Sequence, residues 1–258
     1  MKMMLGVFTV ALIGGCAVDN GTNAGESEGE SSDALSGNST PDDGDLAVVG
    51  ISYVNATNQV SYLCTGVLVT PRVVLTAGHC TVALQSGVVF VGKGPGNFPE
   101  VVTIKAHYAH PNYTSGSATG LNDIGAVVLE RPITTASPLA ISQANLSAVP
   151  LPLSAKLVGY GLTDPNNPNS LGTKRVGFAQ ITKVNPTEFK FSKNQGPNSA
   201  LACGGDSGGP AIVNVGGAEV VVGIAVRSFC GINGQGPTFY TRVDAFQGLI
   251  QDWIRSAG

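Results

Sequence analysis

The run Gly204-Gly205-Asp206-Ser207-Gly208-Gly209-Pro210 sets one serine in a frame of glycines. Glycines on both sides let a substrate carbonyl approach Ser207, and they let the backbone adopt dihedral angles that other residues avoid. Neighbouring N–H groups can then converge on one point. The run therefore predicts a nucleophilic serine beside an oxyanion hole. An isolated match to G-x-S-x-G would be explained better by a solvated serine in a glycine-rich turn.

Two distant segments favour the nucleophile. Residues 75–80 read L-T-A-G-H-C and place His79 after a β-branched run and beside Cys80. Residues 121–129 read L-N-D-I-G-A-V-V-L and place Asp123 at the start of an apolar strand. A buried carboxylate needs a hydrogen-bonded partner, and an imidazole N–H would be a natural one. A serine nucleophile, a histidine base and an orienting aspartate make a complete set for acyl transfer.

The order of these residues distinguishes two classes of hydrolase. G-D-S-G-G also fits the nucleophile elbow of α/β-hydrolases, in which the histidine follows the serine. Here all three histidines, His79, His107 and His110, precede Ser207. T-A-G-H-C, N-D-I-G-A-V-V-L, G-D-S-G-G-P and G-P-T-F-Y-T-R-V occur in the order typical of one family. From about residue 46 to the C-terminus, the chain resembles the trypsin/chymotrypsin family of serine proteases.

The expected fold is all-β. The resemblance implies two antiparallel six-stranded β-barrels, about 46–135 and 155–243, followed by a C-terminal α-helix over 243–256. Apolar and β-branched stretches separated by Gly, Pro and Asn also predict many short strands. Helical spacing of apolar residues occurs only near the end of the chain. We expect strands at 47–54, 60–69, 73–77, 88–92, 101–106, 124–130, 156–161, 176–184, 188–192, 210–214, 219–226 and 238–243.

The N-terminal part has a different composition. Residues 1–15 combine Lys2 with an apolar run too short to span a bilayer, which predicts a secretory signal peptide. Residues 13–16, I-G-G-C, resemble the processing site of bacterial lipoproteins, at which Cys16 would be lipidated; ordinary signal cleavage nearby is the alternative. Residues 16–45 are rich in Gly, Ser and acids and contain no Lys or Arg. We expect them to be a disordered acidic linker or propeptide.

The number of cysteines and the net charge indicate where the protein is located and what it binds. Five cysteines are odd for an exported chain, and lipidation of Cys16 would leave four, which can pair in three ways. The resemblance implies the disulfides Cys64–Cys80 and Cys203–Cys230. Disulfides frequent in animal relatives are missing, so we expect a bacterial exported monomer, either secreted or lipid-anchored at the cell envelope. A net charge of −3 with 12% charged residues gives no sign of a nucleic-acid surface, or of membrane contact other than this anchor.

The resemblance also implies a function and a site. It predicts a serine endopeptidase that acts on protein or peptide substrates without metal or cofactor, with the N–H groups of Gly205 and Ser207 as the oxyanion hole. His107-x-x-His110 resembles a turn motif of the family rather than a metal site. A catalytically silent homologue acting as a surface binding module is the alternative, and an esterase is a third possibility.

Substrate preference and activation follow from the same resemblance. Leu201 at the base of the substrate pocket, and Ser228 and Thr238 on its walls, predict cleavage after small or medium apolar residues. A slip in register could instead bring Arg227 toward the pocket. Family members are commonly activated when a new N-terminal ammonium inserts beside the aspartate before the serine, here Asp206. Residues 34–37, A-L-S-G after Asp33, lie where that N-terminus is expected.

Overall fold

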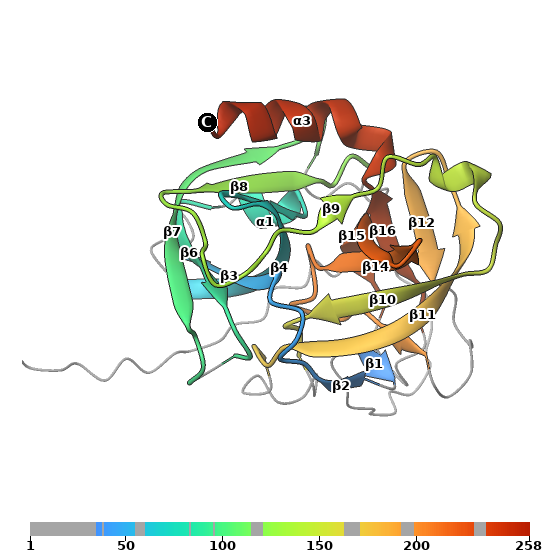
Figure 1. Cartoon of the computed structure of the whole chain (residues 1–258), viewed down its shortest axis with the longest axis horizontal. Helices are drawn as coiled ribbons and strands as arrows, with labels where there is room; N and C mark the ends of the chain where they lie inside the picture. The colour runs from blue at the N-terminus through green and yellow to red at the C-terminus, as the bar shows by residue number, and fades with distance from the viewer. Residues whose placement is uncertain are drawn as a thin grey trace, which may run out of the picture.

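A computed structural model describes residues 35–37, 39–54, 60–82, 84–94, 96–114, 121–162, 171–191, 199–229 and 236–258. The predicted signal peptide and the lipidation site Cys16 lie outside these residues. Within them, the chain forms two antiparallel β-barrels side by side and a C-terminal helix (Figure 1). This confirms the predicted fold. No described helix is long and apolar enough to cross a membrane.

The first barrel closes in the order β3-β4-β5-β8-β7-β6. Its strands alternate between buried and more exposed residues where one face meets solvent, as in β7, whereas β5 and β8 are buried along their whole length. The barrel interior is filled with Val, Leu and Ile side chains. The strands are β3 (Val48–Val54), β4 (Val60–Thr70), β5 (Val73–Thr76), β6 (Ser86–Val91), β7 (Glu100–Ala109) and β8 (Gly125–Leu129).

The second barrel runs β10-β14-β15-β16-β12-β11 and closes through pairing of β11 with β10. Its core contains the aromatic residues Phe189, Phe191 and Tyr240, whose rings contact one another. A separate apolar cluster that includes Phe90 and Tyr160 lies between the barrels. The strands are β10 (Leu153–Gly159), β11 (Arg175–Val184), β12 (Glu188–Phe191), β14 (Pro210–Val215), β15 (Ala218–Ser228) and β16 (Thr238–Arg242).

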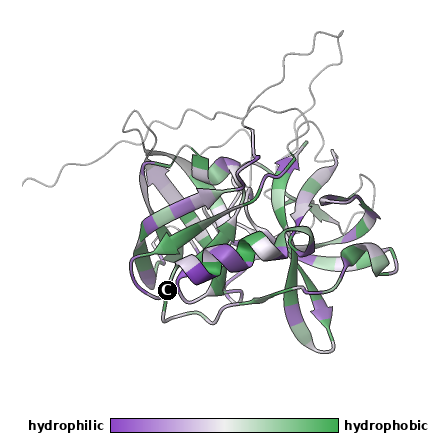
Figure 2. Cartoon of the chain, turned by 90° about the horizontal axis from the view of Figure 1, so that it is seen from above, coloured by the Kyte–Doolittle hydropathy of each residue, from purple (hydrophilic) through white to green (hydrophobic). Residues whose placement is uncertain are grey.

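The C-terminal helix α3 spans Gln247–Ser256 and packs on the first barrel. It begins later than position 243 because a 3₁₀ turn, η3 (Asp244–Phe246), comes first. Ile250 and Trp253 are buried, and the Trp253 ring stacks on Tyr108 of β7. Figure 2 shows hydrophilic and hydrophobic residues mixed along α3, as expected for a helix with one buried face.

Four very short strands connect these elements, and two of them fall in the segment predicted to be a disordered linker. β1 (Ser36–Gly37) pairs with β13 (Ala200–Leu201), and β2 (Ser39–Pro41) pairs with β11. β9 (Ala140–Ile141) pairs with β15, and the turn η1 covers Leu146–Ala148. The folded domain therefore begins before residue 46, because backbone pairing holds residues whose polar composition predicts disorder.

Candidate active site

His79 is placed by a sharp turn between the end of β5 and a short helix. It begins α1 (His79–Val82), and Thr81 closes the turn by donating from Oγ1 to the carbonyl of Gly78 at 2.8 Å. The disulfide Cys64–Cys80, which was predicted, joins β4 to this helix. The backbone of His79 is therefore fixed from both directions of the chain, while about a third of its side chain is exposed (32%).

Asp123 is buried immediately before β8, with 4% of its side chain exposed. Its Oδ1 accepts from the backbone N–H of His79 at 2.9 Å, and its Oδ2 lies 2.8 Å from Nδ1 of the His79 ring. Because a carboxylate oxygen accepts hydrogen bonds, this contact orients the ring with Nδ1 as the donor, and Nε2 is the ring nitrogen left for proton transfer. Thr241 of the second barrel donates to the Asp123 carbonyl at 2.9 Å.

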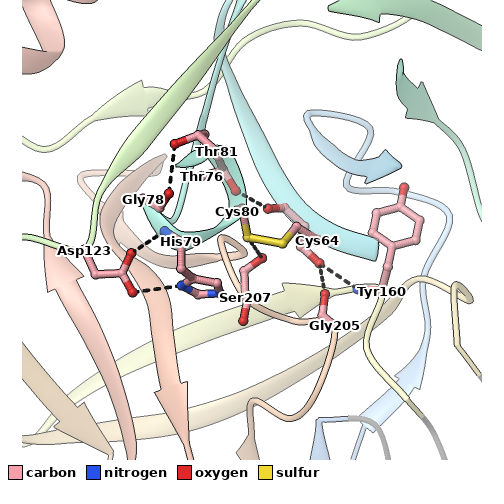
Figure 3. The surroundings of a disulfide bond; sticks show 11 residues. Cys64, Thr76, Gly78, His79, Cys80, Thr81, Asp123, Tyr160, Gly205 and Ser207 are labelled. Atoms are coloured by element: carbon pink, nitrogen blue, oxygen red, sulfur yellow. Dashed lines mark hydrogen bonds and ion pairs between the residues drawn. A yellow bond between two sulfur atoms is a disulfide. The ribbon is translucent and has the colours of Figure 1, made fainter. Parts of the chain in front are cut away.

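Ser207 lies in the loop between β13 and β14, facing this pair. The ring of His79 lies between Asp123 and Ser207 (Figure 3). Gly208 has φ +85, and a Cβ there would meet Oγ1 of Thr76 at 2.0 Å and the carbonyl of Thr65 at 2.2 Å. Only glycine fits this position without displacing the first barrel.

One residue that the sequence interpretation missed, Thr65, joins the serine loop to the first barrel. Its N–H donates to the carbonyl of Ser207 at 2.8 Å and its hydroxyl donates to the carbonyl of Gly205 at 2.9 Å. The same hydroxyl accepts from the N–H of Tyr160 at 3.1 Å. A threonine beside a cysteine carries no local signal of this role, because all three partners are distant in sequence.

The backbone N–H groups of the serine loop fall into two sets. Those of Asp206, Gly208 and Gly209 donate to the carbonyls of Cys203, Ala225 and Asp206. Within the part of the chain that the structure describes, the N–H groups of Gly204, Gly205 and Ser207 donate to no other group. Gly205 adopts φ +93. The free donors of Gly205 and Ser207 lie on alternate residues of a fixed loop and could bind an oxyanion together.

Asp206 is a second buried carboxylate in this loop, with 2% exposure. Its Oδ1 accepts from Gly161 N at 2.8 Å, and its Oδ2 accepts from Cys203 N at 2.9 Å and from Leu35 N at 3.4 Å. Burial raises the pKa of Asp206 to about 6, although these three backbone hydrogen bonds oppose the shift. Leu35 is fully buried and has φ +40, an uncommon conformation for leucine.

The structure describes all three of the predicted pocket residues. Leu201 is buried in β13, and Ser228 of β15 pairs directly with Thr238 of β16. Thr238 is buried, and its Oγ1 has no hydrogen-bond partner among the described residues. The segments 192–198 and 230–235 on either side lie outside the described residues, as does Cys230. Cys203 is disulfide-bonded, and its pairing with Cys230 stays a prediction.

Arg227 is held in an ion pair. Its guanidinium donates to both carboxylate oxygens of Glu188, at 2.7 and 3.0 Å, and lies 4.6 Å from the ring centre of Phe239. The guanidinium of Arg227 and the carboxylate of Glu188 are therefore paired with each other. Beyond Ala225, β15 pairs only with β16 among the described strands.

His110 is packed against the protein by its ring contacts. His110 accepts from Asn112 N at Nδ1 and packs edge-on against Phe246, and burial lowers its pKa. The group of metal-type ligands found among the described residues is Cys64, His79 and Cys80, whose two sulfurs are bonded to each other. His107 and His110 are not part of it.

Comparison with known proteins gives consistent results. A family model described as Trypsin matches residues 36–254. A chymotrypsin of Phaedon cochleariae is 30% identical over 221 residues, covering 78% of this chain and 75% of that protein. A trypsin of Saccharopolyspora erythraea is 27% identical, covering 75% of this chain and 87% of that protein. A solved structure of HL collagenase matches with a TM-score of 0.70 at 19% identity, covering 84% and 96% of the two chains.

Proposed function

This chain belongs to the trypsin family of serine proteases and is a serine endopeptidase, and we propose that Ser207, His79 and Asp123 carry out its reaction. Its substrates are proteins or peptides. The observation that carries the assignment is the double contact of Asp123 with the backbone and ring of His79. This contact supports a fixed imidazole whose other ring nitrogen faces the serine (Figure 3).

The proposed reaction follows from these positions. The Oγ of Ser207 attacks the carbonyl carbon of the scissile bond while Nε2 of His79 takes its proton. The carbonyl oxygen gains negative charge, which the free N–H groups of Gly205 and Ser207 would stabilise. His79 then gives the proton to the leaving amine, and an acyl-enzyme remains on Ser207. Water, deprotonated by His79, releases the acid and restores the serine.

Kinetics of triad variants test this mechanism. His79→Ala and Ser207→Ala should each lower kcat by about 10⁴-fold or more, and the double variant should be scarcely worse, because groups that act as a unit give non-additive losses. Multiplying losses would contradict the shared mechanism. A catalytically silent binding homologue would show no turnover even in the unmodified protein, and an esterase would cleave ester but not amide substrates.

We further propose that the pocket accepts small or medium apolar side chains before the scissile bond. Thr238 and Ser228 would narrow it, and Leu201 offers no charge to a basic side chain. The nearby carboxylate of Glu188 is neutralised by Arg227, so a lysine or arginine would be left desolvated without a counter-charge. Cleavage of a peptide library should favour Ala, Val or Leu. A dominant preference for basic or aromatic residues would overturn the proposal.

The maturation of the protein is part of the same proposal. We propose that the bond before Leu35 is cleaved, one residue later than the start at Ala34 that the sequence suggests, and that the new ammonium pairs with Asp206, whose Oδ2 already lies 3.4 Å from Leu35 N. A buried carboxylate gains from such a partner. We also propose export from a bacterium, with lipidation at Cys16. Intact-mass measurement of membrane-extracted protein and of Cys16→Ala protein tests the lipid.

A further inference from the structure

One buried charge has no role in the proposed reaction. The side chain of Lys174 is completely buried, just before β11. Its ammonium donates to the carbonyl of Asp45 at 2.7 Å and lies 3.6 Å from Oδ2 of Asp42 and 6.0 Å from the ring centre of Tyr160. Burial lowers the pKa of Lys174 more than the charge of Asp42 raises it.

Stability alone does not explain this ammonium. Desolvation of a buried ion pair often costs as much as the attraction returns, so an apolar side chain of similar length would serve the core equally well. The ammonium adds a fixed position for the Lys174 side chain, because it must stay in contact with the carbonyl of Asp45 and the carboxylate of Asp42. Asp42 is itself fixed, because its carboxylate accepts from Gly44 N at 3.0 Å and from Asp45 N at 3.2 Å.

The backbone around Lys174 is anchored to three parts of the fold. The N–H of Lys174 donates to the carbonyl of Lys93, after the first barrel's β6, at 2.7 Å. Its carbonyl accepts from Asp42 N at 2.9 Å. Two residues earlier, Gly172 N donates to the carbonyl of Tyr160, between the barrels, at 2.9 Å. The segment 171–174 is therefore held where both barrels and the N-terminal strand β2 meet.

The other end of this segment contacts the serine loop. A Cβ on Gly205 would lie 2.7 Å from Cδ1 of Leu171 and 2.9 Å from Cα of Gly161. Gly205 is thus packed closely against Leu171 and Gly161. Its position depends on how firmly Leu171 is held, and the N–H of Gly205 is one of the two proposed oxyanion donors.

We propose that Lys174 is a positioning residue for the oxyanion hole, acting by fixing the segment whose Leu171 packs against Gly205. The inference rests on the proposed function. Loss of the ammonium should let Leu171 shift and loosen the Gly205 N–H, which would weaken binding of the transition state more than binding of the substrate.

The experiment compares Lys174→Met with Lys156→Met. Lys156 also pairs with Asp45, at 2.6 Å, and with Glu219, but it lies in β10 outside this segment. Removing a whole oxyanion donor costs about 10²- to 10³-fold, so Lys174→Met should lower kcat by about 10- to 100-fold with KM changed less than about twofold. Its affinity for a peptide aldehyde, which forms an oxyanion on Ser207, should fall by the same factor. Lys156→Met should change neither value.

Equal kcat and equal aldehyde affinity in the two variants would overturn the inference. If Lys174→Met does not fold, Leu171→Ala decides the matter: it leaves every charge in place, and it should lower kcat and aldehyde affinity together. Unchanged values in Leu171→Ala would refute the inference. Absence of turnover in the unmodified enzyme would instead contradict the proposed function, so the two failures are distinguishable.

Discussion

The uncleaved chain should become less stable as pH rises through the range in which Asp206 ionises. In the folded chain the pKa of Asp206 is about 6, against an ordinary value of 3.8. The folded state therefore holds a proton that the unfolded state has released between about pH 4 and pH 6, and stability falls with pH there. The difference of 6 − 3.8 = 2.2 units corresponds to about 3 kcal/mol at 1.36 kcal/mol per unit.

The substitution Asp206→Asn isolates this contribution. It also removes hydrogen bonds, but that cost does not depend on pH. Both proteins are compared as uncleaved chains that also carry Ser207→Ala. The difference in their free energies of unfolding, measured with urea at pH 3.5 and pH 7, should change by about 3 kcal/mol between the two pH values. A chain that begins at Leu35 should lose this trend, because its ammonium would favour the ionised carboxylate. A difference that stays constant with pH in the uncleaved chain would refute the reasoning.

Three further predictions concern other sites. Burial alone would raise the pKa of Glu100, but hydrogen bonds from Thr134, Thr135 and Arg131 outweigh it and lower the pKa to about 2. The protein should therefore lose stability as pH falls from about 4.5 toward 2. Glu100→Gln should remove this loss when acid unfolding is followed by circular dichroism. Gly208→Ala should lower kcat by about 100-fold or more, because its Cβ meets Thr76 and Thr65. Gly216→Ala, at a residue with φ +60 and open space around it, should leave kcat unchanged. Equal kcat values for the two variants would show that the serine loop tolerates the clash. Since the proposed pocket accepts alanine, one enzyme molecule should cleave the Ala34–Leu35 bond of another. N-terminal sequencing should then find Leu35 as the first residue, and the rate of cleavage should rise with protein concentration. An active chain that keeps residue 34 would exclude this route.

The fold was predictable from the sequence because its signals are local. Each barrel strand is a β-branched stretch between turn residues, and the helix carries its own spacing of apolar residues. The start of helix α3 was less predictable, because the 3₁₀ turn η3 precedes it. In that turn the carboxylate of Asp244 accepts hydrogen bonds from the Arg242 side chain and from the N–H of Leu146 in η1, which is a distant segment.

The parts that could not be predicted depend on contacts between distant segments. β1 and β2 have polar sequences, and they are held in place by backbone pairing with β13 and β11 and by the buried side chain of Leu35. The sequence allows Arg227 to lie near the pocket, but in the structure the side chain of Arg227 pairs with Glu188, which is 39 residues away. The hydroxyl of Thr65 likewise acts on Gly205, 140 residues later. No local pattern encodes such pairs.

Labelling with a fluorophosphonate tests the central claim most directly, because the probe reacts only with a serine activated by its surroundings. Mass spectrometry of the labelled protein should find one adduct, on Ser207, and labelling should be lost in both Ser207→Ala and His79→Ala. An adduct on another residue, or equal labelling of the His79→Ala protein, would contradict the account of Ser207 as a nucleophile activated by His79 and Asp123.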